Sequence, residues 1–189
     1  MRNMAANASP LGYALLGLLH QREETGYGLQ KFFEDSPMGA YSSSPGAIYP
    51  ALKRLERNGL VVSRLREDGP VKRSKVYSPT PDGTEALTSW LKSEITKHDV
   101  ETGMDVLMLR FAFYGLLGDR QATRTFLAAL AERIEAYLGT LEDTQALLER
   151  AGADVHARLA LEAGRETYRA QARWARRALN ELEGAADER

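Results

Sequence analysis

Apolar residues recur with the period of an α-helix at the start of the chain. Ser9-Pro10 supplies an N-cap and a proline at the first helical position, so we expect a helix from there to about His20. Its leucines cover most of the helix circumference, which predicts burial on several sides. Thr25 caps a second predicted helix, which ends near Asp35 and is followed by turn residues.

A third helix is predicted from Ser44-Pro45 to the stop signal at Asn58-Gly59. Because Pro50 removes a backbone donor inside this segment, we expect a local distortion or a late start there. Three- and four-residue steps give the helix one apolar face, with Ile48, Leu52 and Leu55. The same spacing gives it an adjacent exposed face, with Tyr49, Lys53 and Arg57.

The pattern changes to that of strands between Leu60 and Pro79. Two apolar arms flank the turn residues 67–70, which predicts a short hairpin. Thr80-Pro81 repeats the cap-proline start and opens a fourth helix, which we expect to run through Ile95. The order helix, helix, helix, hairpin, helix is that of a winged helix-turn-helix domain.

The second half of the chain is predicted to be entirely helical. The segment 104–117 is apolar almost all round, and two long helices follow at about 120–150 and 155–182. Their heptad-like steps form a narrow apolar seam of Leu127, Leu130, Ile134, Tyr137, Leu141, Leu148, Tyr168, Leu179 and Leu182. Such helices are not stable alone in water, so they must pack on each other, on segment 104–117 or on another subunit.

The predicted fold is therefore mainly α. We expect a winged helix-turn-helix DNA-binding domain over residues 1–97 and an all-helical dimerisation domain over residues 98–189. The length of 189 residues, with 43% hydrophobic and 27% charged residues, argues against a disordered chain and against a membrane protein. No apolar stretch reaches the ~20 residues that span a bilayer, and no convincing signal peptide is present, so we expect a cytoplasmic protein.

Composition also narrows the possible chemistry. The chain has no cysteine and three scattered histidines, so we expect no metal site and no cofactor. Its adjacent carboxylates fall in turns, where they are usually solvated, and no catalytic constellation can be assembled from them. We therefore predict that the protein is not an enzyme.

Charge is distributed unevenly along the chain. The formal net charge is -1, yet residues 41–80 contain eight basic and three acidic side chains. A local excess of this kind suits a polyanionic partner such as double-stranded DNA, although a solvated charged face is an equally simple interpretation.

The basic excess falls on the third helix and the hairpin, the parts of a winged helix that contact the major groove and the DNA backbone. Serine hydroxyls at a helix N-terminus bind phosphate, a glycine allows close approach, and long side chains reach base edges. The candidate DNA-binding residues are Ser42, Ser43, Ser44, Gly46, Tyr49, Lys53, Arg54, Arg66, Lys72, Arg73 and Lys75. The alternative is a winged-helix adaptor that acts through protein–protein contacts of its C-terminal helices.

A possible signal-receiving site is suggested by aromatic residues near the predicted domain junction. Trp90, Phe111, Phe113 and Tyr114 could line a pocket for a small aromatic effector. Aromatic residues at helical spacing are more often part of a core or of a dimer interface, and both interpretations stay open.

Four blocks of sequence resemble the PadR family of bacterial transcriptional regulators. They read SPLGYALLGLL at 9–19, TGYGL at 25–29, SPGAIYPALKRLE at 44–56 and KVYSPTPDG at 75–83. The helical second half resembles, more loosely, the C-terminal domain of the larger PadR subgroup, which is shared with a virulence-gene activator. The resemblance implies a homodimer, a palindromic operator, usually repression, and in several members relief by a small aromatic or cationic ligand.

Overall fold

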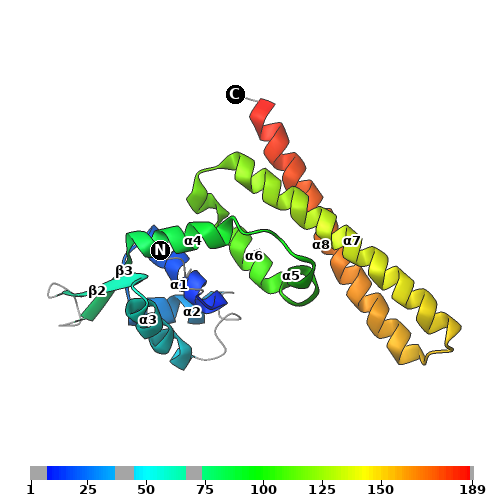
Figure 1. The fold of residues 1–189 in the computed structure, drawn as a ribbon, viewed down its shortest axis with the longest axis horizontal. Coiled ribbons are helices and arrows are strands. Elements are labelled where there is room, and N and C mark those ends of the chain that lie inside the picture. Colours follow the sequence, from blue (N-terminus) through cyan, green and yellow to red (C-terminus); the bar gives the residue numbers. More distant parts are fainter. Residues whose placement is uncertain (1–7, 37–44, 67–73, 188–189) are drawn as a thin grey trace, which may run out of the picture. The chain divides into compact units, whose positions relative to one another are not determined.

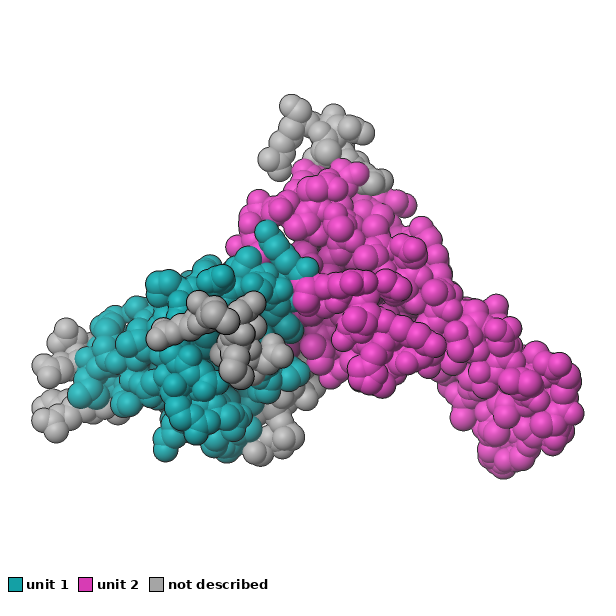
Figure 2. Space-filling view, viewed as in Figure 1, with its two compact units in different colours: residues 1–92 teal, residues 93–189 magenta. Residues whose placement is uncertain are grey.

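The computed structural model describes residues 8–36, 45–66 and 74–187, with backbone alone at Pro45 and at 183–187. The chain forms two compact units, residues 1–92 and residues 93–189, which we call the N-terminal unit and the C-terminal unit (Figure 2). The division lies five residues before the predicted domain boundary at residue 97. The functional division at that boundary stays a prediction.

The N-terminal unit combines helices with a small antiparallel sheet, in the order predicted from the sequence (Figure 1). Its elements are α1 (Pro10–Gln21), β1 (Glu24–Thr25), α2 (Gly26–Glu34), the 3₁₀ turn η2 (Pro45–Ala47), α3 (Ile48–Arg57), β2 (Val61–Arg66), β3 (Ser74–Pro79) and α4 (Pro81–Leu91). The sheet order is β1-β3-β2, and both pairings are antiparallel. This is the topology of a winged helix, and it confirms the predicted fold class; the two-residue strand β1 was not predicted.

Three helices of this unit begin at the caps that the sequence predicts. The hydroxyls of Ser9, Thr25 and Thr80 each accept a hydrogen bond from the backbone N–H three residues later. Helix α3 starts late, after η2, so that Pro50 falls in its first turn. A first-turn N–H has no intrahelical partner, which is why the proline is tolerated there.

Helix α1 forms the centre of the N-terminal core. Leu15, Leu16 and Leu19 are almost completely buried, and α1 contacts α3, β3 and α4. Burying one such side chain stabilises the fold by about 1.5–3 kcal/mol. The predicted burial of α1 on several sides is confirmed, and this core fixes α3 and the hairpin to one scaffold.

The fourth helix is shorter than expected. It was predicted to run through Ile95, but α4 ends at Leu91 with Lys92 as its C-cap. Ile95 is buried outside any helix, so its apolar character reflects tertiary packing and not a continued helical face. A separate helix, α5 (Lys97–Thr102), begins with a capping box in which Thr96 and Asp99 exchange hydrogen bonds.

All the secondary-structure elements among the described residues of the C-terminal unit are helices. After α5 come α6 (Met104–Ala112), the 3₁₀ turn η3 (Tyr114–Leu117), α7 (Arg120–Arg150) and α8 (Val155–Asp187). The continuous helix expected over 104–117 is therefore wrong, because α6 ends at Ala112, with Phe113 as its C-cap, and η3 follows. Gly118 after η3 and Gly152 after α7 have a left-handed backbone, with φ of 58° and 65°, a conformation in which glycine commonly ends a helix.

Helices α7 and α8 pack on each other, one of the three arrangements left open by the sequence (Figure 1). Leu127, Leu130 and Ile134 of α7 are completely buried within the single chain, and α7 also contacts α5 and η3. Farther along the pair, Tyr137 of α7 and Tyr168 of α8 meet edge to face, with ring centroids 4.9 Å apart. Part of the predicted seam is thus intramolecular core.

Candidate nucleic-acid interface

Helix α3 separates an apolar face from a polar one. Ile48, Ala51, Leu52 and Leu55 are buried against the N-terminal core. The opposite face is exposed and carries one aromatic and three basic side chains: Tyr49, Lys53, Arg54 and Arg57. The helix is therefore held by one side and presents a row of hydrogen-bond donors and positive charge on the other.

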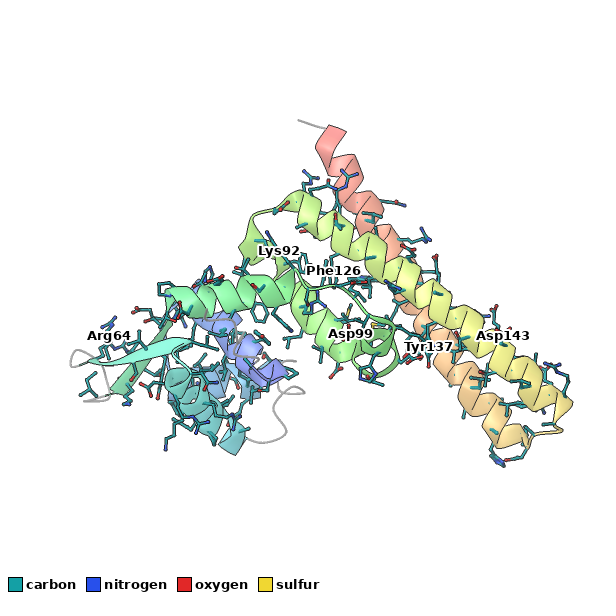
Figure 3. The ribbon with its side chains drawn as sticks, viewed as in Figure 1. Arg64, Lys92, Asp99, Phe126, Tyr137 and Asp143 are labelled. Atoms are coloured by element: carbon teal, nitrogen blue, oxygen red, sulfur yellow. The ribbon has the colours of Figure 1, made fainter. Side chains whose placement is uncertain are left out.

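The hairpin divides its basic residues between two faces. Directly paired residues in an antiparallel ladder point to the same side of the sheet. Ser63 pairs with Tyr77, and Leu65 with Lys75, so these four share one face. That face is turned toward α3, since Ser63 donates a hydrogen bond to the Glu56 carboxylate of α3. Arg64 and Arg66 alternate with them and lie on the other face (Figure 3 labels Arg64).

Two acidic residues from outside the hairpin pair with its cations. Glu23 lies 2.6 Å from the guanidinium of Arg64, and Glu56 lies 3.9 Å from the Lys75 amine. Within the described part of the N-terminal unit, ion pairs involve Arg22, Arg64 and Lys75 but not Lys53, Arg54, Arg57 or Arg66. Among these four described cations without an ion pair, three lie on α3.

The predicted DNA-binding residues fall into three groups. Tyr49, Lys53 and Arg54 lie together on the exposed face of α3, and Gly46 is exposed in η2 just before it. Lys75 and Arg66 lie on opposite faces of the hairpin. The remaining five, Ser42, Ser43, Ser44, Lys72 and Arg73, lie outside the described residues. The sequence analysis missed Glu23 and Glu56, because pairing with distant residues leaves no local signal.

The predicted effector residues belong to different units. In the N-terminal unit, Trp90 stacks on Tyr13, with ring centroids 4.4 Å apart and ring planes within 4°. In the C-terminal unit, Phe111 and Tyr114 pack with Phe126, and Trp174, which the sequence analysis did not select, meets Phe111 edge to face at 5.2 Å. These contacts leave the predicted effector site untested.

Arg110 lies beside this aromatic cluster and is 3% exposed. Its guanidinium donates a hydrogen bond to the carbonyl oxygen of Ser93 and lies 5.4 Å from the ring centroid of Phe126. Burial raises the pKa of the Tyr114 phenol, and the neighbouring Arg110 opposes that rise. Phe113 is 3% exposed and Tyr114 is 5% exposed, so both contribute to the core of this unit.

Other binding features of the described residues are sparse. A pocket of about 230 Å³ lies between the end of α7 and the start of α8, and its lining includes Gln145, Val155, Arg158 and Leu159. No group of three acidic or histidine side chains among the described residues could hold a metal ion. Within the same part of the chain, no helix is both long enough and apolar enough to cross a bilayer.

Comparison with known proteins divides the chain into two matching regions. Residues 15–89 match the transcriptional regulator PadR-like family, and residues 105–183 match the virulence activator alpha C-term family. The negative transcriptional regulator PadR of Bacillus subtilis is 32% identical over 134 residues, which are 70% of this chain and 71% of that protein. Transcriptional regulator Rv3488 of Mycobacterium tuberculosis is 53% identical over 49 residues, 25% of this chain and 44% of the relative.

A crystal structure of Bacillus subtilis PadR in complex with operator DNA aligns with 92% of this chain and 99% of its own, at 26% identity and a TM-score of 0.42. The family assignment rests on the sequence relationship with the Bacillus subtilis protein and not on this superposition. On that relationship, and on the two regions matched, the chain belongs to the PadR-like family of transcriptional regulators.

Proposed function

We propose that this protein is a sequence-specific DNA-binding repressor that acts in the cytoplasm as a homodimer on a palindromic operator, and that it has no enzymatic activity. The observation that carries the proposal is the exposed face of α3, where Tyr49 and three basic side chains project from a winged-helix scaffold. Repression is supported by the relationship to a Bacillus subtilis protein described as a negative regulator.

Each part of the interface has its own role in this proposal. Tyr49 and Lys53 read base edges in the major groove, because both are exposed on α3 and have side chains long enough to reach the bases. Arg54, Arg66 and Lys75 contact phosphates, together with residues that precede α3 or fall between β2 and β3 in the sequence: Ser42, Ser43, Ser44, Gly46, Lys72 and Arg73. Phosphate contacts supply affinity, and base contacts supply discrimination.

Dimerisation is assigned to residues 98–189. Leu127, Leu130 and Ile134 are already buried by the single chain, so they have no surface left to offer a second subunit. The proposed interface therefore depends on the partly exposed remainder of the seam: Tyr137, Leu141, Leu148, Tyr168, Leu179 and Leu182. A symmetric dimer presents two α3 helices to half-sites about one DNA turn, ~34 Å, apart.

A small aromatic effector is the proposed inducer. The Bacillus subtilis relative has been crystallised in complex with p-coumaric acid. In this chain the proposed contacts are Trp90, Phe111, Phe113 and Tyr114, since flat apolar rings favour an aromatic guest. Phenolic acids should then quench tryptophan fluorescence and release DNA, and Trp90→Ala should impair that release. A set of phenolic acids that leaves DNA affinity unchanged would remove this part of the proposal.

The DNA-binding proposal is tested by recovering genomic fragments with the purified protein and then measuring the dissociation constant against salt. Neutralising Lys72, Arg73 and Lys75 together should weaken binding to all sequences and flatten the salt dependence. Tyr49→Ala should instead reduce the preference for the recovered sequence over random DNA. Failure to recover any enriched fragment would favour the adaptor alternative.

A further inference from the structure

The ring of Tyr49 packs directly on the backbone of α2. Gly26 is the first residue of that helix and is buried. A methyl group added to Gly26 would lie 2.6 Å from Cε1 of the Tyr49 ring, 3.2 Å from Cδ1 and 3.3 Å from Cζ. These separations are shorter than carbon–carbon van der Waals contact, so an alanine and the present ring position are incompatible.

The backbone at Gly26 is anchored from two directions. Thr25, immediately before it, caps α2 by accepting a hydrogen bond from the Gly28 N–H at 2.9 Å. The same residue pairs with Val76 in the β1–β3 ladder. The Tyr49 side chain, in contrast, is 44% exposed and can rotate about its own χ angles. A conflict at this contact would therefore be relieved by movement of the ring and not of the helix.

A buried tyrosine lies on the sheet face that is turned toward α3. Tyr77 of β3 is 6% exposed and shares its face with Ser63, which bonds to Glu56 of α3. Burial raises the pKa of the Tyr77 phenol, with further contributions from Glu56 and Tyr49. The contact with Gly26 places the Tyr49 ring against the start of α2.

We propose that Gly26 is a positioning residue for DNA recognition: the absence of a side chain at Gly26 sets the orientation in which Tyr49 is presented from α3. The inference rests on the proposed function, in which Tyr49 contacts bases. A base-edge hydrogen bond requires a donor–acceptor distance of about 2.7–3.2 Å, so displacement of the ring by a methyl group disrupts it. Gly26 itself is buried and need not touch the DNA.

A double-mutant cycle in the full-length protein tests this coupling. We compare wild type, Gly26→Ala, Tyr49→Ala and the double variant, using the dissociation constant for a recovered operator fragment and the melting temperature. Tyr49→Ala should weaken binding by about 5- to 150-fold, the range for one base contact. Gly26→Ala should weaken it at least about 5-fold with little change in melting temperature. In the Tyr49→Ala background, Gly26→Ala should add less than about 2-fold, because no ring remains to be displaced.

Gly28→Ala provides a matched control in the same helix. Its added methyl group would lie 2.4 Å from a carboxylate oxygen of Glu24, a flexible side chain that is not Tyr49. Any effect of Gly28→Ala on DNA affinity should therefore be the same with and without the Tyr49 ring. Equal coupling of both glycines to Tyr49 would show a general effect of altering α2 and would overturn the inference.

The remaining outcomes separate the inference from the function on which it rests. If Tyr49→Ala binds the operator like wild type, the assignment of Tyr49 to base recognition fails. If Tyr49→Ala weakens binding but Gly26→Ala does not, the function stands and the positioning role is overturned. A Gly26→Ala protein that does not fold also overturns it, because the inference requires the ring to yield and the helix to remain.

Discussion

Two acidic side chains, Glu23 and Glu56, pair with basic residues of the hairpin and so reduce the positive charge that it can offer to a polyanion. The Glu23–Arg64 and Glu56–Lys75 pairs are both well exposed to solvent, so each contributes little to folding stability. Each pair nevertheless holds a cation that DNA phosphates would otherwise attract. If the hairpin contacts DNA as proposed, the two carboxylates compete with phosphates for its cations, and we expect them to lower affinity for all sequences alike.

Removing one of these carboxylates should strengthen non-specific binding. In Glu23→Gln, Arg64 loses its acidic partner at 2.6 Å and becomes available to a phosphate. We expect tighter binding to random duplex DNA and a salt dependence steeper by up to about one phosphate contact. Fluorescence anisotropy at several salt concentrations measures both quantities.

The control for this charge change is Glu142→Gln. Glu142 pairs with Arg165 and Arg169 in the C-terminal unit, so the variant alters net charge equally without releasing a hairpin cation. Glu142→Gln should leave the salt dependence of DNA affinity unchanged. A Glu23→Gln protein with the wild-type slope would mean that Arg64 does not contact DNA.

Ionisation of the Tyr77 phenol should lower the stability of the fold at alkaline pH. Burial raises its pKa above the ordinary value of 10.0, and the nearby Glu56 and Tyr49 add to the rise. The phenol therefore ionises at a higher pH in the folded state than in the unfolded state. Its contribution to stability is fully present below the pKa of the unfolded state, and it is lost as the pH rises through the pKa of the folded state. The melting temperature should therefore fall above about pH 10, and Tyr77→Phe should reduce that fall. An unchanged alkaline slope in Tyr77→Phe would contradict this assignment.

At the residue scale, local patterns can be predicted and distant pairings cannot. The exposed α3 face was predicted because its residues repeat within a single helix, where spacing alone fixes direction. The ion pair between Glu23 and Arg64 joins residues 41 positions apart. The contact of Gly26 with Tyr49 likewise depends on how α2 meets α3, and no periodicity encodes it.

At the scale of elements, Thr80 links the end of α3 to the start of α4. Its hydroxyl accepts a hydrogen bond from the Gly83 N–H at 3.0 Å and donates one to the Gly59 carbonyl oxygen at 2.6 Å. Its own N–H bonds to the Leu60 carbonyl oxygen. Gly59 has a φ of 71° just after α3, so this one side chain connects the α3 stop to the α4 cap.

Thr80→Val should therefore destabilise the N-terminal unit. Valine keeps the shape of threonine but cannot accept from Gly83 or donate to Gly59, and loss of a cap alone costs about 0.5–2 kcal/mol. We expect a fall in unfolding free energy in that range, measured by urea denaturation. Thr80→Ser retains the hydroxyl and should lose much less. Equal destabilisation by serine and valine would assign the effect to packing and not to hydrogen bonding.

Helix and strand boundaries can be predicted from the sequence only where a local signal marks them. Cap residues located the starts of α1, α2 and α4, because a hydroxyl before a helix is a local signal. Strand β1 has two residues, too few for any pattern, and forms only because β3 lies beside it. The break after α6 at Phe113 precedes the nearest glycine, so continued apolarity concealed it. The capping box of Thr96 and Asp99 is a local signal for a separate helix, but the apolar Ile95 just before it favours a longer α4.

At the scale of the whole molecule, the α7–α8 pair has more apolar surface than it covers. Its buried part includes Ile134 and Ala175, whereas Leu147 is 59% exposed and Leu159 is 56% exposed. Apolar side chains that one chain leaves exposed are available for contact with a second chain. This supports the dimerisation role proposed for residues 98–189 and makes the oligomeric state the decisive measurement.

A chain that ends at residue 97 retains the whole N-terminal unit and lacks α7 and α8. Light scattering should show it to be mostly monomeric, because the proposed interface is gone. Each monomer then binds one half-site without a tethered partner, and loss of that bivalency should weaken binding to the full operator by about 100-fold or more.

Binding to an isolated half-site provides the control, since both proteins present the same α3 and should bind it with similar affinity. A truncated protein that still dimerises and binds the full operator like the intact chain would place dimerisation in the N-terminal unit. Weak binding to the half-site as well would instead point to a folding defect in the truncated chain, which circular dichroism would reveal.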